Sequence, residues 1–136
     1  MPQRLSPRIV PPCPITVAIE EDHGDVLTYG VIADISGSGA RVWTEAHIAV
    51  GSAFQFRISF AAPSEVHEVV GAVVWARYAL NRARKNASQC GVEWLSAGYA
   101  CRARLRELAN RAVPPRQSER FPFEKAWTIT QGWPPS

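Results

Sequence analysis

The sequence predicts a mainly β protein, in which six antiparallel strands form a closed or nearly closed barrel and one C-terminal α-helix follows. Apolar and polar residues alternate along residues 14–94, and turn residues interrupt this alternation at regular intervals, as expected for half-buried strands. After residue 96 the apolar spacing becomes helical. We expect closure because an open sheet with this many apolar residues would leave its edges unpaired.

The six strands are expected at residues 15–19, 26–33, 40–44, 54–60, 66–78 and 89–95. The first leads into the charged run 20–25, which we interpret as a solvated hairpin turn. The second ends at a glycine-containing turn over 34–39, and the third is short. Three phenylalanines and an isoleucine share one face of the fourth. The fifth is long enough to bend near Gly71, and the basic loop 82–86 separates it from the sixth.

The helix is predicted from Ser96, a candidate N-cap, to the residues before Pro114 and Pro115, which cannot continue a helix. The arginines at 102 and 106 are expected on its solvated face. Its apolar positions follow helical spacing at Cys101, Leu105, Leu108 and Ala112.

The composition is that of one globular domain, with 136 residues of which 46% are hydrophobic. No apolar run approaches the roughly 18 residues that span a bilayer, and the start has no apolar signal core. We therefore expect a cytoplasmic protein with no membrane span. Three widely spaced cysteines suit a reducing compartment better than a disulfide framework.

No enzyme or metal motif is found. The three histidines lie in separate segments without a ligand pattern, and no serine or cysteine has the sequence signature of a nucleophile. We therefore predict no catalytic residue, no metal site and no cofactor. The C-terminal half is basic, which favours either a solvated surface or an acidic partner.

We divide the chain into a flexible, arginine-bearing segment (1–13), the barrel with its helix (14–112) and a proline- and aromatic-rich extension (113–136). The extension contains two phenylalanines and two tryptophans, and a disordered tail rarely carries so many aromatic residues. We expect it to dock on its own barrel, on a second copy in a homodimer or on a partner.

Two short motifs carry the chemistry of a binding site. Arg4 and Arg8 form an RxxxR pattern among prolines, where two guanidinium groups could contact phosphates and stack on a flat base. Asp34, Ser36 and Gly39 form a DxSxxG turn, which offers acceptors and a hydroxyl to a base edge and a glycine for close approach or positive φ. The alternatives are a basic tail and a turn whose side chains bond only their own backbone.

Together these motifs resemble the PilZ domain, the bacterial receptor module for cyclic di-GMP. The resemblance extends from residue 4 to about 112 and includes the strands GAVVWAR at 71–77 and CGVEWL at 90–95. It implies a six-stranded antiparallel PilZ-type β-barrel with a C-terminal helix. One departure is that Leu5 and Ser6 follow Arg4, where the family often has further arginines.

The resemblance implies a role for each matching residue. The arginines would hold the phosphates and guanine faces, the aspartate and serine would read a guanine, and the glycine would admit the backbone. Trp75 would pack beside a guanine, although an ordinary core position is the alternative, and Arg77 is a weaker candidate on the same face. The expected cyclic di-GMP site therefore consists of Arg4, Arg8, Asp34, Ser36, Gly39 and Trp75.

We accordingly expect a non-enzymatic cyclic di-GMP receptor in which the ligand draws the segment Arg4–Arg8 onto the turn Asp34–Gly39. An unidentified effector protein would read this conformational change in motility, biofilm or exopolysaccharide control. One alternative is a PilZ-like interaction module that does not bind nucleotide. The other is a small barrel that binds single-stranded nucleic acid, which we disfavour because the strands lack a row of aromatic residues for stacking.

Overall fold

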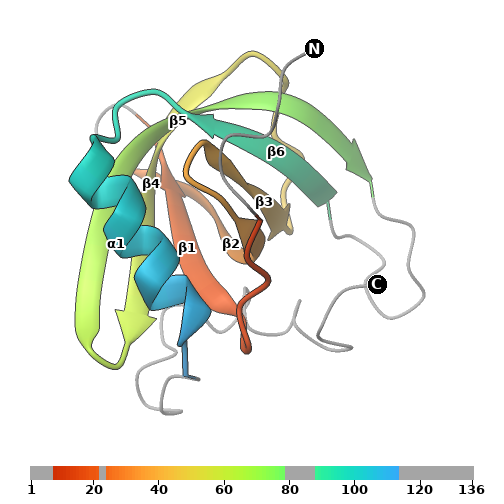
Figure 1. Ribbon diagram of the computed structural model, residues 1–136. Helices are drawn as coiled ribbons and strands as arrows, with labels where there is room; N and C mark the ends of the chain where they lie inside the picture. Colours follow the sequence, from red (N-terminus) through yellow and green to blue (C-terminus); the bar gives the residue numbers. More distant parts are fainter. Residues whose placement is uncertain (1–7, 22–23, 79–87, 114–136) are drawn as a thin grey trace.

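The computed structural model of the chain describes residues 8–21, 24–78 and 88–113, which form six strands and one helix (Figure 1). Arg4 and the extension 114–136 lie outside the described residues. The elements are β1 (Ile15–Glu20), β2 (Val26–Ile35), β3 (Gly39–Thr44), β4 (Ala53–Ala61), β5 (Ser64–Tyr78), β6 (Ser88–Trp94) and α1 (Tyr99–Asn110).

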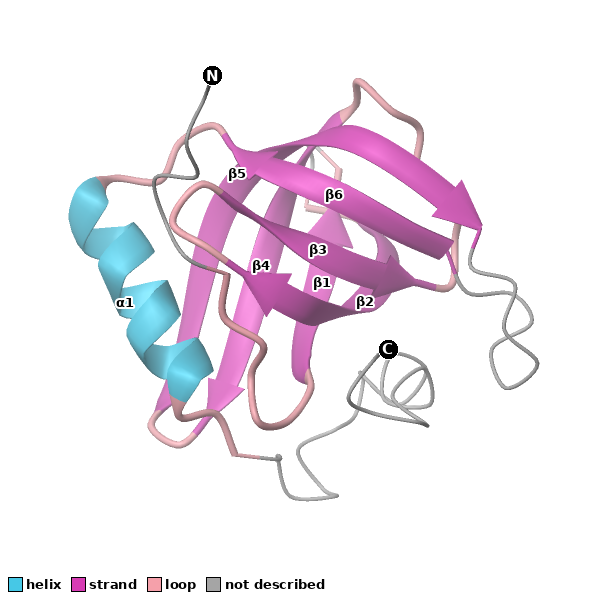
Figure 2. Cartoon of the chain, turned by 45° about the vertical axis from the view of Figure 1, so that its right-hand side comes forward, coloured by secondary structure: helices cyan, strands magenta, loops and turns pink. Residues whose placement is uncertain are grey.

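The strands form a closed antiparallel barrel in the order β1-β2-β3-β6-β5-β4, with β1 paired to β4 (Figure 2). β1–β2, β2–β3, β4–β5 and β5–β6 pair as hairpins, whereas β3 and β4 do not pair with each other. The β1–β4 and β3–β6 pairings join distant parts of the chain. The closed six-stranded barrel with a C-terminal helix confirms the predicted fold class. No helix among the described residues is long and apolar enough to span a bilayer.

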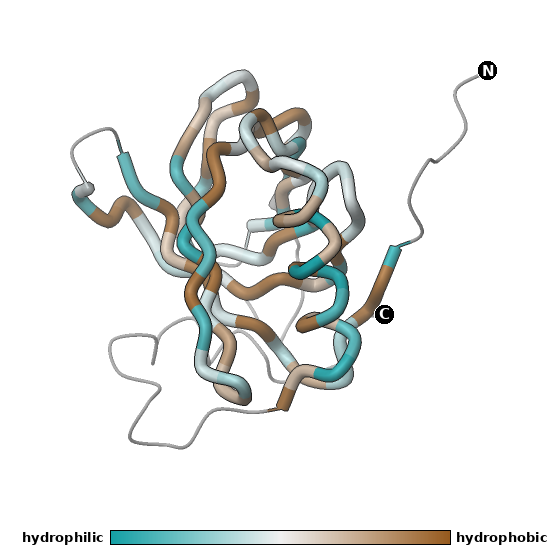
Figure 3. The backbone as a smooth tube through the Cα atoms, turned by 60° about the vertical axis from the view of Figure 1, so that its left-hand side comes forward, coloured by the Kyte–Doolittle hydropathy of each residue, from teal (hydrophilic) through white to brown (hydrophobic). Residues whose placement is uncertain are grey.

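The core confirms the alternation on which the prediction rested. In β4, Phe56 and Ile58 are fully buried, whereas Arg57 between them is exposed. Apolar and polar residues alternate along the strands in the same way in Figure 3. Trp94 on β6 meets Phe56 edge to face inside the barrel, with ring centroids 5.9 Å apart. Leu105 and Leu108 of α1 join this core, so the helix is packed on the barrel through its apolar face.

The helix begins and ends differently from the prediction. Its N-cap is Gly98, without a side-chain cap, and its last residue is Asn110. Ser96, the predicted N-cap, instead accepts a hydrogen bond at its Oγ from the Val70 backbone N–H, at 3.2 Å. The hydroxyl is therefore engaged by β5, which leaves the helix to start at the glycine.

Glu20 does not belong to a solvated turn, as the sequence had suggested. It ends β1 with only 2% of its surface exposed, and its Oε2 lies 3.3 Å from Arg57 Nη2 on the adjacent β4. The buried carboxylate is thus compensated by a cross-strand ion pair. The fifth strand also departs from regularity beyond Gly71, at a register shift between Val73 and Trp75 that is typical of a β-bulge.

Candidate ligand-binding site

The turn between β2 and β3 places Asp34 at the penultimate position of a strand, although the sequence had assigned it to the turn itself. The side chain of Asp34 is 6% exposed, and two arginines hold its two oxygens. Arg8 Nη1 lies 2.6 Å from Oδ1, and Arg41 Nε lies 3.0 Å from Oδ2. Asp34 therefore does not bond only its own backbone, and it links the two predicted motifs directly.

Arg41 is a residue of the site that the sequence reasoning missed. It lies directly opposite Asp34 in the β2–β3 pairing and is partly buried beside it. The signal that could have found it is the hairpin register, since opposite charges on directly paired residues attract. The expected strand ended before Asp34, so this pairing could not be deduced.

Backbone contacts also hold Arg8 at the turn. The neighbouring Ile9 exchanges two hydrogen bonds with Ile35, at 2.7 and 3.0 Å, as an isolated antiparallel bridge. We had expected a ligand to draw Arg8 onto the turn. In the structure Arg8 already contacts Asp34 at the turn without a ligand, so a ligand would have to compete with Asp34 for this guanidinium.

Ser36 forms the local bonds of a tight turn. Its backbone N–H donates to the Gly39 carbonyl at 2.8 Å, and its Oγ accepts a bond from the Ser38 N–H at 3.3 Å. The two serine hydroxyls lie 3.1 Å apart. The interpretation of the turn as self-bonded is therefore correct for Ser36, while the second hydroxyl, on exposed Ser38, faces the same cleft.

Gly39 is required by packing and not by positive φ. Among the described glycines, only Gly24 and Gly51 have positive φ, which corrects the expectation of positive φ at Gly39. A Cβ at Gly39 would lie 3.0 Å from the Val92 carbonyl carbon and would overlap its oxygen. The glycine therefore allows β3 to approach β6 closely.

Trp75 lies on the outer face of β5 and is half-buried, so the ordinary core position considered for it is wrong. Its indole covers Gly91 of β6, where a Cβ would lie 2.7 Å from Trp75 Cδ1. Arg77 shares this face, as predicted, with its guanidinium 5.6 Å from the Trp75 ring centroid. Gln89 orients that guanidinium by accepting bonds at its Oε1 of 2.9 and 3.1 Å.

A surface cleft of about 190 Å³ brings most of the predicted residues together. Arg8, Ser36 and Gly39 lie on one side and Trp75 on the other, and Asp34 is joined to it through Arg8. The lining residues are Arg8, Ser36, Ser38, Gly39, Ala40, Val74, Trp75, Gly91, Val92 and Glu93. A guanidinium, hydroxyls and an exposed indole face suit a planar heterocycle that carries an anion.

Arg102 connects the turn to the helix. We had expected a solvated side chain, but Arg102 is half-buried and donates to the Gly37 carbonyl from Nη1 at 2.9 Å and to the Ala97 carbonyl from Nε at 2.7 Å. Sequence spacing alone could not reveal this contact, because Gly37 and Arg102 meet only after the barrel has closed.

The sequence and the fold were compared with known proteins. The family model described as PilZ domain matches residues 2–111. No curated protein matches the sequence. Among solved structures, the PilZ domain of YcgR from Escherichia coli, in complex with c-di-GMP, superposes with a TM-score of 0.62 at 16% identity, covering 92% of this chain and 98% of that one.

Two longer proteins superpose as well. Whole YcgR from Escherichia coli with c-di-GMP gives a TM-score of 0.62 at 16% identity over 93% of this chain. The inhibitor of motility MotI/DgrA of Bacillus subtilis gives 0.56 at 14% identity over 80% of this chain. The matched region spans only 50% of each of these two chains. At such identities the likeness establishes the shared fold.

Proposed function

Because the chain belongs to the PilZ domain family, we propose that it is a cyclic di-GMP receptor that binds the dinucleotide in the cleft beside the β2–β3 turn. The observation that supports this most is the convergence of Arg8, Ser36, Gly39 and Trp75 on one cleft, with Asp34 attached to it. The complexes of YcgR with c-di-GMP are consistent with a nucleotide ligand for this fold.

Each side chain has a role that follows from its chemistry. Arg8 would form a two-pronged contact with a phosphate or a guanine face, together with Arg4, which lies outside the described residues. Asp34 would accept hydrogen bonds from a guanine edge, and the serine hydroxyls would bond the base or a phosphate oxygen. The half-exposed face of Trp75 would stack on a guanine.

Binding would proceed by exchange of ion-pair partners. A phosphate would take the Arg8 guanidinium from Asp34, which frees Oδ1 to meet guanine donors. Arg41, whose Nε lies 3.0 Å from Oδ2, would keep the carboxylate oriented during the exchange. The Ile9–Ile35 bridge would then move with Arg8, and a partner protein would detect the altered N-terminal segment.

We propose that the protein acts on an unidentified cytoplasmic partner in the control of motility, biofilm or exopolysaccharide production. It would bind cyclic di-GMP without catalysing a reaction. The motility inhibitor among the similar structures fits such an output. One observation favours a second candidate, an interaction module that does not bind nucleotide. The Asp34 carboxylate is satisfied internally, since Arg8 and Arg41 hold its two oxygens.

Isothermal titration of the full chain with cyclic di-GMP tests the proposal, with GTP and a short oligonucleotide as ligand controls. We expect micromolar or tighter binding, and for Arg8→Ala at least a tenfold loss, or about 1.4 kcal/mol. Arg111→Ala, an exposed arginine beyond the helix, is the matched control and should bind normally. Absence of binding by the unmodified protein would contradict the receptor function and favour the interaction module.

A further inference from the structure

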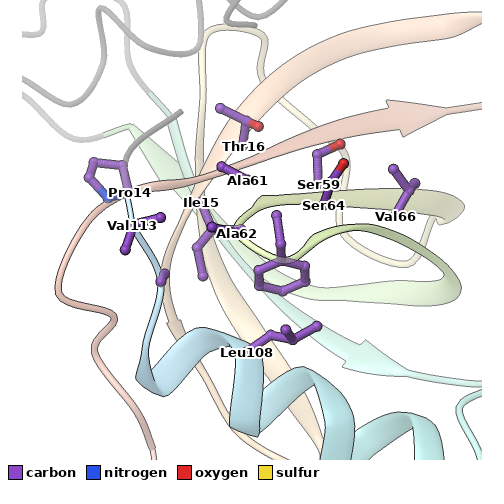
Figure 4. A pocket seen from close by; sticks show the side chains of 12 residues that line it. Pro14, Ile15, Thr16, Ser59, Ala61, Ala62, Ser64, Val66, Leu108 and Val113 are labelled. Carbon is purple, nitrogen blue, oxygen red and sulfur yellow. The ribbon is translucent and has the colours of Figure 1, made fainter. Parts of the chain in front are cut away.

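A second cavity, of about 180 Å³, lies away from the ligand cleft and shares no residue with it. It is enclosed by the start of β1, the hairpin between β4 and β5, and the C-terminal end of α1 (Figure 4). Most of its lining residues are apolar, among them Ile15, Phe60, Ala62, Leu108 and Val113, although polar atoms contribute about half of its open surface. Among the described residues, the lining contains no charged side chain that would recognise an ionic metabolite.

The rim of this cavity exposes apolar surface to solvent. Val66 on β5 is 56% exposed and Val113 is 46% exposed. In Figure 4 the side chains of Val113 and Leu108 approach the cavity from the helix side and Val66 marks its far end. The polar side chains of the lining are the hydroxyls of Thr16, Ser59 and Ser64. An apolar group that entered the cavity would remove this surface from water.

The position of the cavity bears on which group could occupy it. Val113, the last described residue, is part of the wall, so the chain continues from the rim into residues 114–136. Phe121 follows eight residues later, and an extended segment of that length reaches about 26 Å, more than enough to return to the cavity. A cavity of about 150 Å³ can hold benzene, so the volume here matches one phenyl ring.

We propose that residues 121–123 of the same chain dock on this cavity, with the Phe121 ring inside it. Pro122 favours an extended backbone, in which Phe121 and Phe123 point to the same side. The second ring then covers exposed Val66 at the rim. This docking is independent of the proposed nucleotide function, because the cavity and the cleft have no residue in common.

Amide hydrogen exchange of the full chain, followed by mass spectrometry, tests this. We expect peptides covering 119–127 to exchange at least about ten times more slowly than an unstructured segment. Burial of a phenylalanine ring supplies at least the free energy that corresponds to a tenfold ratio of docked to undocked segment. Val66→Glu, which places a carboxylate at the rim, should abolish the protection. Val70→Glu, on the outward face of the same strand but outside the cavity, should preserve it.

Phe121→Ala provides a test that leaves the barrel wall intact, and it should also abolish the protection. Exchange of 119–127 at the unstructured rate in the unmodified protein would overturn the proposal, as would equal protection in Val66→Glu and Val70→Glu. The measurement is repeated at a tenfold higher protein concentration with the mass determined in solution. Protection that appears only with a dimer would assign the segment to a second copy and refute docking within one chain.

Discussion

Alanine at Gly91 should disable the ligand cleft and leave the barrel folded, whereas alanine at Gly39 should destabilise the barrel itself. At Gly91 the added Cβ would lie 2.7 Å from Cδ1 of the Trp75 side chain. At Gly39 it would overlap the Val92 carbonyl oxygen, which is fixed backbone of β6. Ordinary contacts begin near 3.4 Å, so the neighbour must move in both cases, but only Trp75 can move by rotating a side chain.

The magnitudes follow from what each movement disrupts. At Gly91, displacement of the indole forfeits its packing and the stacked Arg77, which together cost about 1 kcal/mol at a half-exposed site. At Gly39 the β3–β6 strand pair must separate, and overpacking against backbone costs about 3 kcal/mol or more. With a urea m-value of about 2 kcal/mol/M, the midpoint falls by about 0.5 M for Gly91→Ala and by about 1.5 M for Gly39→Ala.

Urea denaturation of the two variants and titration with cyclic di-GMP measure both effects. Gly91→Ala should bind about tenfold more weakly, because stacking of one base on an aromatic ring contributes about 1–3 kcal/mol. Equal midpoints for the two variants would refute the assignment of Gly39 to strand packing. Unchanged affinity in a folded Gly91→Ala protein would refute the role of Trp75.

Two further predictions concern the contacts of the helix. Arg102→Gln removes the bond to the Gly37 carbonyl and should lower the free energy of unfolding by about 1 kcal/mol, with faster amide exchange over residues 36–39; unchanged exchange there would contradict the coupling. The pKa of Glu65 is lowered from 4.5 to about 2, mainly by its hydrogen bond with Arg104 and to a smaller extent by its hydrogen bond with His67. The contribution of this carboxylate to stability is present above pH 4.5 and is lost as the pH falls toward 2. The urea midpoint of Glu65→Gln should therefore change less with pH across that window than the midpoint of the unmodified protein. Parallel pH profiles of the two midpoints would refute this.

The architecture was predictable because alternation along a strand depends only on the sequence itself. Phe56 and Ile58 reveal which face of β4 is buried wherever the strand lies in the sheet. Part of the cleft lining was predictable for a related reason, because the side chains of a short motif can be read directly from the sequence. Arg8 and Asp34, far apart in sequence, do meet at 2.6 Å.

The residues that escaped prediction are those whose roles depend on register or tertiary contact. Arg41 belongs to the site because β2 continues two residues further than expected, to Ile35, and Arg102 because α1 lies beside Gly37. Glu20 was assigned to a turn from its charged neighbours, yet pairing with β4 buries it beside Arg57. No local pattern contains this information.

The strand order has a consequence for how the site is assembled as the protein folds. One wall of the cleft comes from the N-terminal half, at Ser36 and Gly39, and the other from Trp75 and Gly91. β3 obtains its second partner only when β6, the last of the described strands, pairs with it through Gly39 and Glu93. Such pairings between distant segments form slowly, because loop closure precedes any gain from contact. During synthesis the ligand cleft is therefore completed only after the sixth strand has emerged, so that binding competence coincides with closure of the barrel.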